Sequence, residues 1–360
     1  MADPISTLAT HVTAPVDYVL MKGLLSAARK KLPFFNGTLP GELQKNKGSM
    51  SVKWRRINNL SAATTALGEL SGDWPIARTG VTPVISDVTV AMAKYGNHIK
   101  FTEELDLFNV NSRSVQLVDT LGANAGESLN ILMQTAFGAG ATARISGAAP
   151  TLTSMTTAMT LNDVKYVVNQ LNRNSAMRFT SDAYGRDAYN NQPVRASYLG
   201  ICHPDVEEDI RGMTGFIAVE QYGGYTSTYP FEFGAVGGVR WSSSEICTIT
   251  TAVTGATSTG IRGPGGTNVT TIHSVYDSYI YGQEAVGSVG LGNMHATSNY
   301  EMYDPKKPPA VELIVKAIGS AGAADPYNEV GTIAWKAWFA GKVLDGSWIF
   351  KLQSGASLLV

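Results

Sequence analysis

Apolar residues recur every three or four positions between Asn111 and Gly138, and the rest of the chain is organised around this segment. The stripe consists of Leu117, Leu121, Ala125, Leu129, Leu132 and Ala136, with Val118 and Ile131 widening it. This spacing predicts one buried face of an α-helix. Asparagine and serine at 111 and 112 suit its first turn, and glycines at 138 and 140 suit its end.

We assign this helix to residues 112–137, with Leu117, Leu121 and Leu132 as its core. About 26 residues at ~1.5 Å each make a rod of roughly 40 Å, well over the mean length of helices in globular proteins. Such a rod is either a core helix of an ordinary globular enzyme or a spine that carries two other regions. Gly122 and Gly126 lie on one side of it and leave room for a close neighbour.

Strict alternation of apolar and polar residues predicts two long β-strands before the helix. The first covers residues 49–60, where Met50, Val52 and Trp54 point one way. The second covers residues 84–101, and Gly96 is expected to mark a bulge in it. Together the two strands predict an extended arm.

The segment between these strands, residues 61–83, is irregular and dotted with glycine. A loop of that length inside a compact domain is uncommon unless it has a function. Its large apolar residues include Leu67, Leu70, Trp74 and Ile76. A thin two-stranded arm has too little surface to bury them, so we expect a neighbouring subunit to cover them, with Trp74 as the main anchor.

The remaining pattern predicts a mixed chain of helices and strands. Helices are expected over residues 16–31, 160–171 and 205–211, and strands over 197–202, 239–241, 276–281 and 311–318. Thr160 and Asp163 match a capping box at the start of the second of these helices. Residues 248–269 are rich in Thr and Gly and are expected to form a surface excursion. The aromatic residues between 330 and 352 are expected to anchor a core or an interface.

Composition narrows the classes of function. The 360 residues are 44% hydrophobic, enough for a packed core, and 28 basic against 29 acidic side chains give a net charge of −1. A chain this neutral is not expected to hold nucleic acid by neutralising phosphates. No stretch approaches about 18 apolar residues, so no membrane-spanning segment is expected, and the N-terminus lacks a secretory signal. Cys202 and Cys247 are too few for a disulfide scaffold and are expected to be buried, reduced thiols.

Candidate chemistry is sparse. The best cluster is His203 with Asp205, Glu207, Glu208 and Asp209, which suits a metal site or acid–base catalysis. The same acids suit the first turn of a helix, where they complement its dipole, and we prefer this second interpretation. The glycine-rich segment 263–268 lacks the Lys and Ser/Thr of a phosphate loop. We therefore expect no catalytic, cofactor-binding or metal site.

Short motifs along most of the chain, from about residue 20 to 350, resemble the major capsid proteins of N4-like tailed bacteriophages. They include GSMSVKWRR at 48–56, ATTAL at 63–67, TGVTP at 79–83, Tyr95-Gly96, HPDV at 203–206, GGVR at 237–240 and GTIAWKAWFA at 331–340. Residues 68–78 depart from the family, which has a short Leu-x-Glu-Gly-x-x-Pro run there.

The resemblance implies a fold: the α+β architecture of Hong Kong 97-type phage major capsid proteins. It divides the chain into an N-terminal arm at 1–48, an extended two-stranded loop at 49–100, a peripheral domain with the spine helix at 101–144 and 291–360, and an axial domain at 145–290. The resemblance brings no active site and no cofactor with it.

The resemblance also implies a function, that of a major capsid protein which self-assembles into the icosahedral head around the double-stranded DNA of a tailed phage. The partners would be further copies of the chain in hexamers and pentamers, scaffold, portal and cementing proteins, and packaged DNA held without sequence-specific contact. The protein would assemble in the host cytoplasm and reside in the virion, with no membrane involved. Two alternatives stay open: a soluble α+β hydrolase centred on His203 and Asp205, and a β-rich carbohydrate-binding or tail module.

Overall fold

The computed structural model describes residues 24, 32–42, 50–57, 60, 82–104, 113–179, 196–221, 229, 231–254, 260–267, 272–290, 311–316, 318, 327 and 329–358. Most of the predicted N-terminal arm and of the irregular segment 61–83 lie outside these residues. The predicted helix 16–31 does so as well, except for Leu24, which is helical and fully buried.

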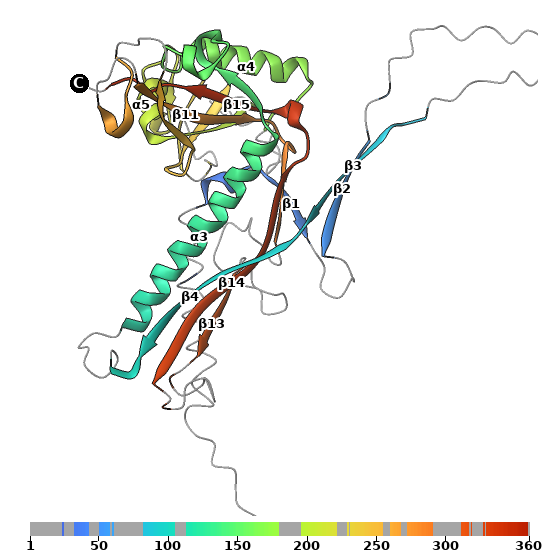
Figure 1. The fold of residues 1–360 in the computed structure, drawn as a ribbon. Helices are drawn as coiled ribbons and strands as arrows, with labels where there is room; N and C mark the ends of the chain where they lie inside the picture. Colours follow the sequence, from blue (N-terminus) through green and yellow to red (C-terminus); the bar gives the residue numbers. More distant parts are fainter. Residues whose placement is uncertain are drawn as a thin grey trace, which may run out of the picture.

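The long predicted helix is confirmed as α3, which spans Arg113–Gly140 and has 28 residues. In Figure 1 it runs down the length of the molecule, from the larger upper unit to the far end of the smaller sheet. Its most deeply buried apolar residues are Val118, Leu121, Ala125, Leu129, Met133 and Phe137.

The buried stripe of α3 is rotated from the predicted one. Leu121 is buried, but Leu117 and Leu132 are half-buried and pack at the margin of the core. Ile131, which was expected to widen the stripe, is instead 44% exposed. The reason is that the row at strict four-residue spacing, which ends in Met133 and Phe137, is the one that meets the core.

A five-stranded sheet lies along α3. Its longest strand, β14 (Val330–Val343), pairs antiparallel with β4 (Ala93–Thr102) on one side. On the other side β14 pairs first with β13 (Glu312–Lys316) and then with β12 (Val286–Gly290), and β1 (Leu39–Glu42) joins β12 in parallel. Trp335 of β14 donates from Nε1 to Asn124 of α3 at 3.1 Å, so this face of the sheet meets the helix.

The bulge expected at Gly96 is absent, because the β4–β14 ladder keeps its register from Ala93 to Thr102. A Cβ at Gly96 would lie 2.6 Å from the backbone oxygen of Trp335. Glycine at this position therefore serves the close approach of two backbones, which is the other common reason for glycine inside a strand.

An eight-stranded sheet forms the core of the upper unit. Its strands follow the order β5 (Thr142–Ile145), β15 (Ile349–Ser354), β11 (Ile272–Tyr281), β6 (Tyr198–Cys202), β9 (Val239–Ser243), β8 (Glu232–Val236) and β7 (Ile217–Ala218). The eighth strand, β10 (Ile249–Thr254), pairs with β11, so the start of the expected surface excursion is a strand instead. Its Thr-rich sequence suits that role, because β-branched residues favour strands.

Two of the described α-helices belong to the upper unit. One is α4 (Leu161–Arg173), which begins at the predicted capping box: Thr160 and Asp163 each accept a hydrogen bond from the backbone N–H of the other. The other is α5 (Pro204–Arg211), which follows β6. None of the described helices is long and apolar enough to cross a membrane.

Strand pairing departs from the predicted domain limits at two places. β15 lies within 291–360, which was assigned to the domain of the spine helix, yet it pairs with β11 and β5 in the larger sheet. β12 lies within 145–290, yet it pairs with β14 and β1 in the smaller sheet. The chain thus crosses between the two sheets more often than contiguous ranges allow.

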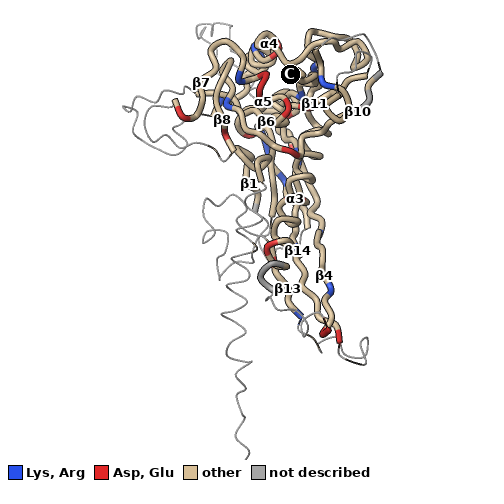
Figure 2. Tube along the Cα trace, turned by 90° about the vertical axis from the view of Figure 1, so that its left-hand side faces the viewer, with Lys and Arg blue, Asp and Glu red and all other residues tan. Residues whose placement is uncertain are grey.

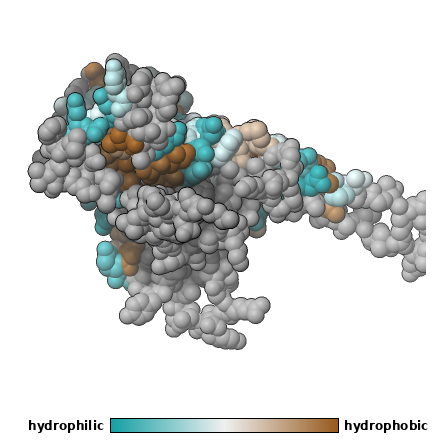
Figure 3. All heavy atoms as spheres, turned by 90° about the horizontal axis from the view of Figure 1, so that it is seen from below, coloured by the Kyte–Doolittle hydropathy of each residue, from teal (hydrophilic) through white to brown (hydrophobic). Residues whose placement is uncertain are grey.

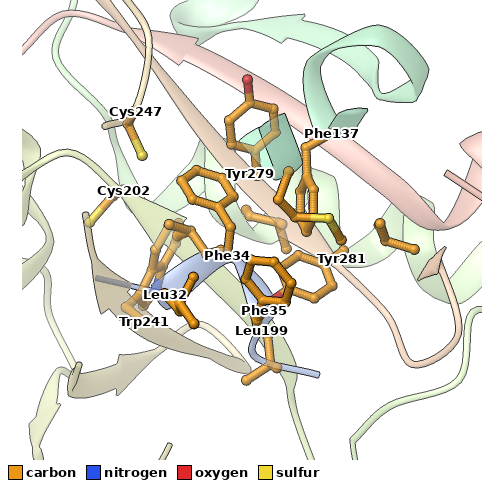
Figure 4. Packing of buried hydrophobic residues seen from close by; sticks show 14 of the residues in the cluster. Leu32, Phe34, Phe35, Phe137, Leu199, Cys202, Trp241, Cys247, Tyr279 and Tyr281 are labelled. Atoms are coloured by element: carbon orange, nitrogen blue, oxygen red, sulfur yellow. The ribbon is translucent and has the colours of Figure 1, made fainter. Parts of the chain in front are cut away.

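Residues 32–42 close the core between α3 and both sheets. Phe34 packs edge to face on Phe137 of α3 and Tyr279 of β11, with ring centroids 5.4 and 5.8 Å apart (Figure 4). Its backbone N–H donates to the side-chain oxygen of Asn130 at 3.1 Å. Tyr281 of β11 donates from its hydroxyl to the backbone oxygen of Asn36 at 2.6 Å. This short segment therefore joins the helix to the larger sheet, while β1 adds it to the smaller one.

Candidate functional site

The arm is the surface feature that sets this molecule apart from an ordinary two-sheet protein. The two predicted strands are confirmed as β2 (Ser51–Ile57) and β3 (Ile85–Ala91), which pair antiparallel from Ser51–Ala91 to Ile57–Ile85. Figure 1 shows them projecting sideways from the body. The predicted strand 84–101 is divided at Met92, because β3 pairs with β2 whereas β4 pairs with β14.

Apolar side chains on the arm remain open to solvent. Met50, Val84 and Ile85 are 59%, 64% and 51% exposed. Seen from below, the described part of the arm carries hydrophilic and hydrophobic atoms side by side as it leaves the body (Figure 3). A two-stranded ribbon has no core of its own, so apolar groups on it are buried only when another surface covers them.

The base of the arm is packed on the smaller sheet. Val52, Trp54 and Val90 of the arm contact a small cluster formed by Met92, Val289 and Ala340, with Trp338 beside it. The indole of Trp54 lies over two glycines of neighbouring strands. A Cβ at Gly41 would come within 2.7 Å of it, and one at Gly287 within 2.8 Å. The glycines therefore form the flat surface on which this ring rests.

The opposite face of the arm carries an ion-pair cluster. Asp87 of β3 accepts from Arg55 at 3.0 Å and lies 2.5 Å from Lys53, both on β2. The hydrogen bonds from Arg55 and Lys53 lower the pKa of Asp87 to about 2. These contacts stay within the arm and hold its two strands in register.

Arg56, the next residue along β2, points the other way and reaches the body. Its guanidinium pairs with the carboxylate of Asp345 and lies over the ring of Trp348, 4.4 Å from the centroid. Both partners belong to the turn that joins β14 to β15 and includes the short helix η8 (Gly346–Trp348). Lys342 of β14 also donates from Nζ to the backbone oxygen of Thr89 on β3, at 3.5 Å. The described contacts between arm and body thus involve Met92, Trp54, Arg56 and Lys342.

Charges on the body are mixed in sign. Figure 2 shows acidic and basic residues both in the upper unit and along the smaller sheet. Lys336 and Glu312, for example, pair across β14 and β13 at 2.8 Å. This distribution agrees with the near-zero net charge of the sequence.

The His203 cluster is occupied by structural contacts. The imidazole Nδ1 caps α5 by accepting from the backbone N–H of Asp205 at 3.1 Å. The carboxylate of Asp205 accepts from the hydroxyl of Tyr276 at 2.8 Å and pairs with Arg262. Burial is the main cause that lowers the pKa of His203, and burial likewise raises the pKa of Tyr276 to about 12.

The remaining acids of α5 are distributed around the helix. Glu207 pairs with Arg211 one turn later at 2.6 Å, and Asp209 accepts from the backbone N–H of Ser357 at 3.0 Å. These contacts match the helix-stabilising interpretation of the cluster. Within the described part of the chain, no group of three or more His, Cys, Asp or Glu side chains is placed to hold a metal ion.

Cys202 and Cys247 are free and buried, as predicted (Figure 4). Burial raises the pKa of both thiols. A thiol that stays protonated is a poor nucleophile, so neither residue is suited to nucleophilic catalysis.

The sequence identified part of this site and missed part. The four predicted interface residues of the arm, Leu67, Leu70, Trp74 and Ile76, lie outside the described residues. Alternation placed Trp54 on one face of β2, but nothing in the sequence pointed to its glycine partners or to the contact between Arg56 and Asp345.

Comparisons with known proteins identify the fold. The chain is similar to the capsid of Ralstonia phage GP4, with a TM-score of 0.60 and 10% identity over 91% of this chain and 92% of that one. It is also similar to the capsid of cyanophage P-SCSP1u (TM-score 0.54, 11% identity, 91% and 89% covered). A third similar structure is the head of Helicobacter pylori bacteriophage KHP40 (0.54, 11%, 91% and 91%). No family model matches the sequence, and neither does any curated protein.

These matches confirm the predicted fold class. The chain has the α+β fold of Hong Kong 97-type capsid proteins, and the match extends over about nine tenths of its length. The arm, the long helix and the two sheets are parts of one architecture.

Proposed function

We propose that this chain is the major capsid protein of a tailed bacteriophage and that it self-assembles into the icosahedral head around double-stranded DNA. The observation that carries the proposal is the projecting arm on a body with a capsid-type fold. A ribbon with exposed Met50, Val84 and Ile85 gains burial only from another surface. In a shell, that surface is a neighbouring copy of the chain.

The two units have separate roles in this proposal. The smaller sheet with α3 corresponds to the peripheral domain, and the larger sheet to the axial domain, with β15 and β12 exchanged between them. Hexamers and pentamers form around the axial domains, and arms join neighbouring subunits. The tip residues Leu67, Leu70, Trp74 and Ile76 supply the apolar anchors of that contact.

The narrower assignment to N4-like phages rests on the sequence motifs alone. Two of them lie in parts of the fold that position the arm: GSMSVKWRR contributes β2, and GTIAWKAWFA contributes β14. Scaffold, portal and cementing proteins are further partners under this assignment. The mixed surface charge suits a container whose DNA must remain mobile, because phosphate binding needs clustered cations.

The contacts made by the His203 cluster favour this proposal over a hydrolase. His203 and Asp205 already serve as a helix cap and as the partner of Arg262 and Tyr276. The smaller sheet also lies along a helix of 28 residues, which does not favour a purely β-rich binding module.

Particle formation tests the proposal. The full-length chain is expressed, with and without the phage-derived fractions that supply scaffold, and examined by sedimentation and negative-stain electron microscopy. We expect rings, shells or tubes of megadalton size. A protein that stays monomeric under every condition, while its circular dichroism shows it to be folded, would contradict the proposed function.

A further inference from the structure

We propose that Arg56 is the residue that sets the direction of the arm, by binding the turn where the two sheets of the body meet. This role deepens the proposed function, because arm direction determines which part of a neighbouring subunit the arm can reach. It is a positioning role: Arg56 acts on the arm and not on the neighbour itself.

The attachments of the arm differ in how well they define an angle. The hydrogen bond from Lys342 to the Thr89 oxygen is long, at 3.5 Å, and comes from an exposed, flexible side chain, so it defines the angle poorly. Met92 is a single residue between β3 and β4, so two backbone torsions can turn the arm about it. Trp54 rests on Gly41 and Gly287, and apolar packing on a flat surface is non-directional. Arg56 makes a directional contact, since its planar guanidinium has a fixed donor geometry and also stacks on a ring.

The turn that receives Arg56 is itself held rigid. Asp345 accepts from the backbone N–H of Ser347 at 2.9 Å and from its hydroxyl at 2.6 Å. Trp348 donates from its indole to the backbone oxygen of Asn174, the C-cap of α4, at 3.1 Å. Asn174 in turn donates from its side chain to the backbone oxygen of Ser347 at 2.8 Å.

The turn is also tied to the smaller sheet. The backbone N–H of Leu344 donates to the oxygen of Ala285, just before β12, at 2.8 Å. The strands on either side of the turn, β14 and β15, belong to different sheets. Arg56 therefore binds a point shared by both sheets and α4, and rotation of the arm about Met92 would move Arg56 away from that point.

Arg55 offers a matched control. It is the same residue type on the same strand, but it faces away from the body and binds only Asp87, within the arm, among the described residues. If direction is set by the body contact, removing Arg56 should change the arm angle and removing Arg55 should not.

The test measures arm direction by distance. Spin labels are placed on Ile85→Cys at the far end of β3 and Asn169→Cys on α4, both exposed positions, in the full-length chain. Chains without the introduced cysteines check that buried Cys202 and Cys247 stay unlabelled. Distances are recorded in soluble subunits, and in particles diluted with unlabelled chains, for the parent and for Arg56→Ala, Arg56→Lys, Arg55→Ala and Asp345→Asn.

We expect one narrow distance distribution in the parent and in Arg55→Ala. Arg56→Ala and Asp345→Asn should give a broad or displaced one, with the ratio of arm orientations shifted by roughly five- to thirtyfold if an ion pair and a cation–π contact are both lost. Arg56→Lys should fall between, since it keeps the charge but not the planar group.

Two results would overturn the assignment: an unchanged distribution in Arg56→Ala, or equal broadening in Arg55→Ala. Asp345→Asn keeps a side-chain acceptor for Ser347, so it tests the contact even if an Arg56 variant folds poorly. The measurement on soluble subunits does not need particles. If the proposed function is wrong, the parent chain forms no particles although its soluble subunits give the narrow distance distribution. If the Arg56 role is wrong, the parent forms particles and Arg56→Ala leaves the distance distribution unchanged.

Discussion

Asn130 accepts a hydrogen bond from the backbone N–H of Phe34, 3.1 Å away, where the N-terminal segment 32–42 crosses the long helix. Both residues are buried. Water cannot replace the bond there, so a polar side chain in the middle of an apolar helix face fixes the position of a segment that lies 96 residues earlier in the chain.

Replacing Asn130 by alanine should therefore lower the free energy of unfolding by about 1–3 kcal/mol, because the Phe34 N–H would be left buried without a partner. Denaturant unfolding of the soluble subunit measures it. Thr135→Ala is the control: this residue is exposed on the same helix, and its hydroxyl donates to the Ile131 carbonyl one turn back. Equal effects of the two substitutions would contradict the role given to Asn130.

A graded series along α3 tests the orientation of its buried face. Leu121→Ala should cost roughly 2–5 kcal/mol, since Leu121 is deeply buried. Leu132→Ala should cost less, because that side chain is half-buried, and Ile131→Ala should be close to neutral. Thermal unfolding gives the order. If Leu132 or Ile131 proved as costly as Leu121, the helix would be rotated relative to the described one.

Stability should fall as pH drops through the range where His203 takes up a proton. Burial lowers the pKa of His203 in the folded state, so between that pKa and the ordinary value of 6.5 the unfolded chain binds a proton that the folded chain does not. The stability that neutral His203 contributes is fully present above pH 6.5 and is lost as the pH falls through the lowered pKa of the folded state. Protonation also removes the Nδ1 acceptor that caps α5.

His203→Asn isolates this contribution, because asparagine keeps a capping oxygen but does not titrate. Unfolding is followed from about pH 8 to pH 5 in both proteins, and the variant should show the flatter curve. Parallel curves would exclude the proton linkage.

We also expect His203→Ala and Asp205→Ala to change stability alone. Metal analysis of the parent and of both variants would detect a stoichiometric ion if the cluster held one.

Adding a methyl group under Trp54 should displace the arm from its seat. A Cβ at Gly287 would lie 2.8 Å from the indole, closer than atoms can approach. We expect Gly287→Ala to lower stability and to shift Trp54 fluorescence, and Trp54→Leu in the same chain to restore part of the loss. Gly212→Ala is the comparison, since a Cβ there would meet its nearest atom at 3.5 Å. If Gly287→Ala were as stable as Gly212→Ala, close packing of Trp54 on Gly287 would be contradicted.

The arm tip should matter for assembly and not for folding. Replacing residues 66–78 by a short Gly-Ser linker removes Leu67, Leu70, Trp74 and Ile76. Circular dichroism of the trimmed subunit should match the parent, while sedimentation should show few or no particles. Normal particles would refute the role of the tip, and unfolded subunits would assign it to the core.

Local patterns in the sequence predicted the elements better than their pairing. Helical spacing identified α3, yet Leu132 and Met133 are both apolar, so spacing could not say which row meets the core. The apolar positions change from even numbers (Val88, Val90, Met92) to odd numbers (Tyr95, Ile99, Phe101) at the point where the partner changes, so a shift in the alternation marked this place and the prediction of one continuous strand missed it. The place of β15 beside β11 depends on contacts between residues far apart in sequence.

The candidate site divides in the same way. The parity of β2 fixes that Arg55 and Arg56 face opposite sides. Only the folded chain brings Asp345 and Trp348 to the Arg56 side. Gly41 and Gly287 read as ordinary glycines until the Trp54 ring is placed over both.

The continuity of β3 and β4 through Met92 also determines how the molecule carries a mechanical load. Tension on the arm passes directly into β4, which pairs with β14 at ten successive positions from Ala93 to Thr102. Hydrogen bonds of an antiparallel ladder lie across the strands, so a pull along the strand axis shears all of them together instead of opening them one at a time. In the proposed shell, outward pressure would pull on the arms that join subunits. The arms would pass this force to β4 along its strand axis, the direction in which the β4–β14 ladder resists separation best.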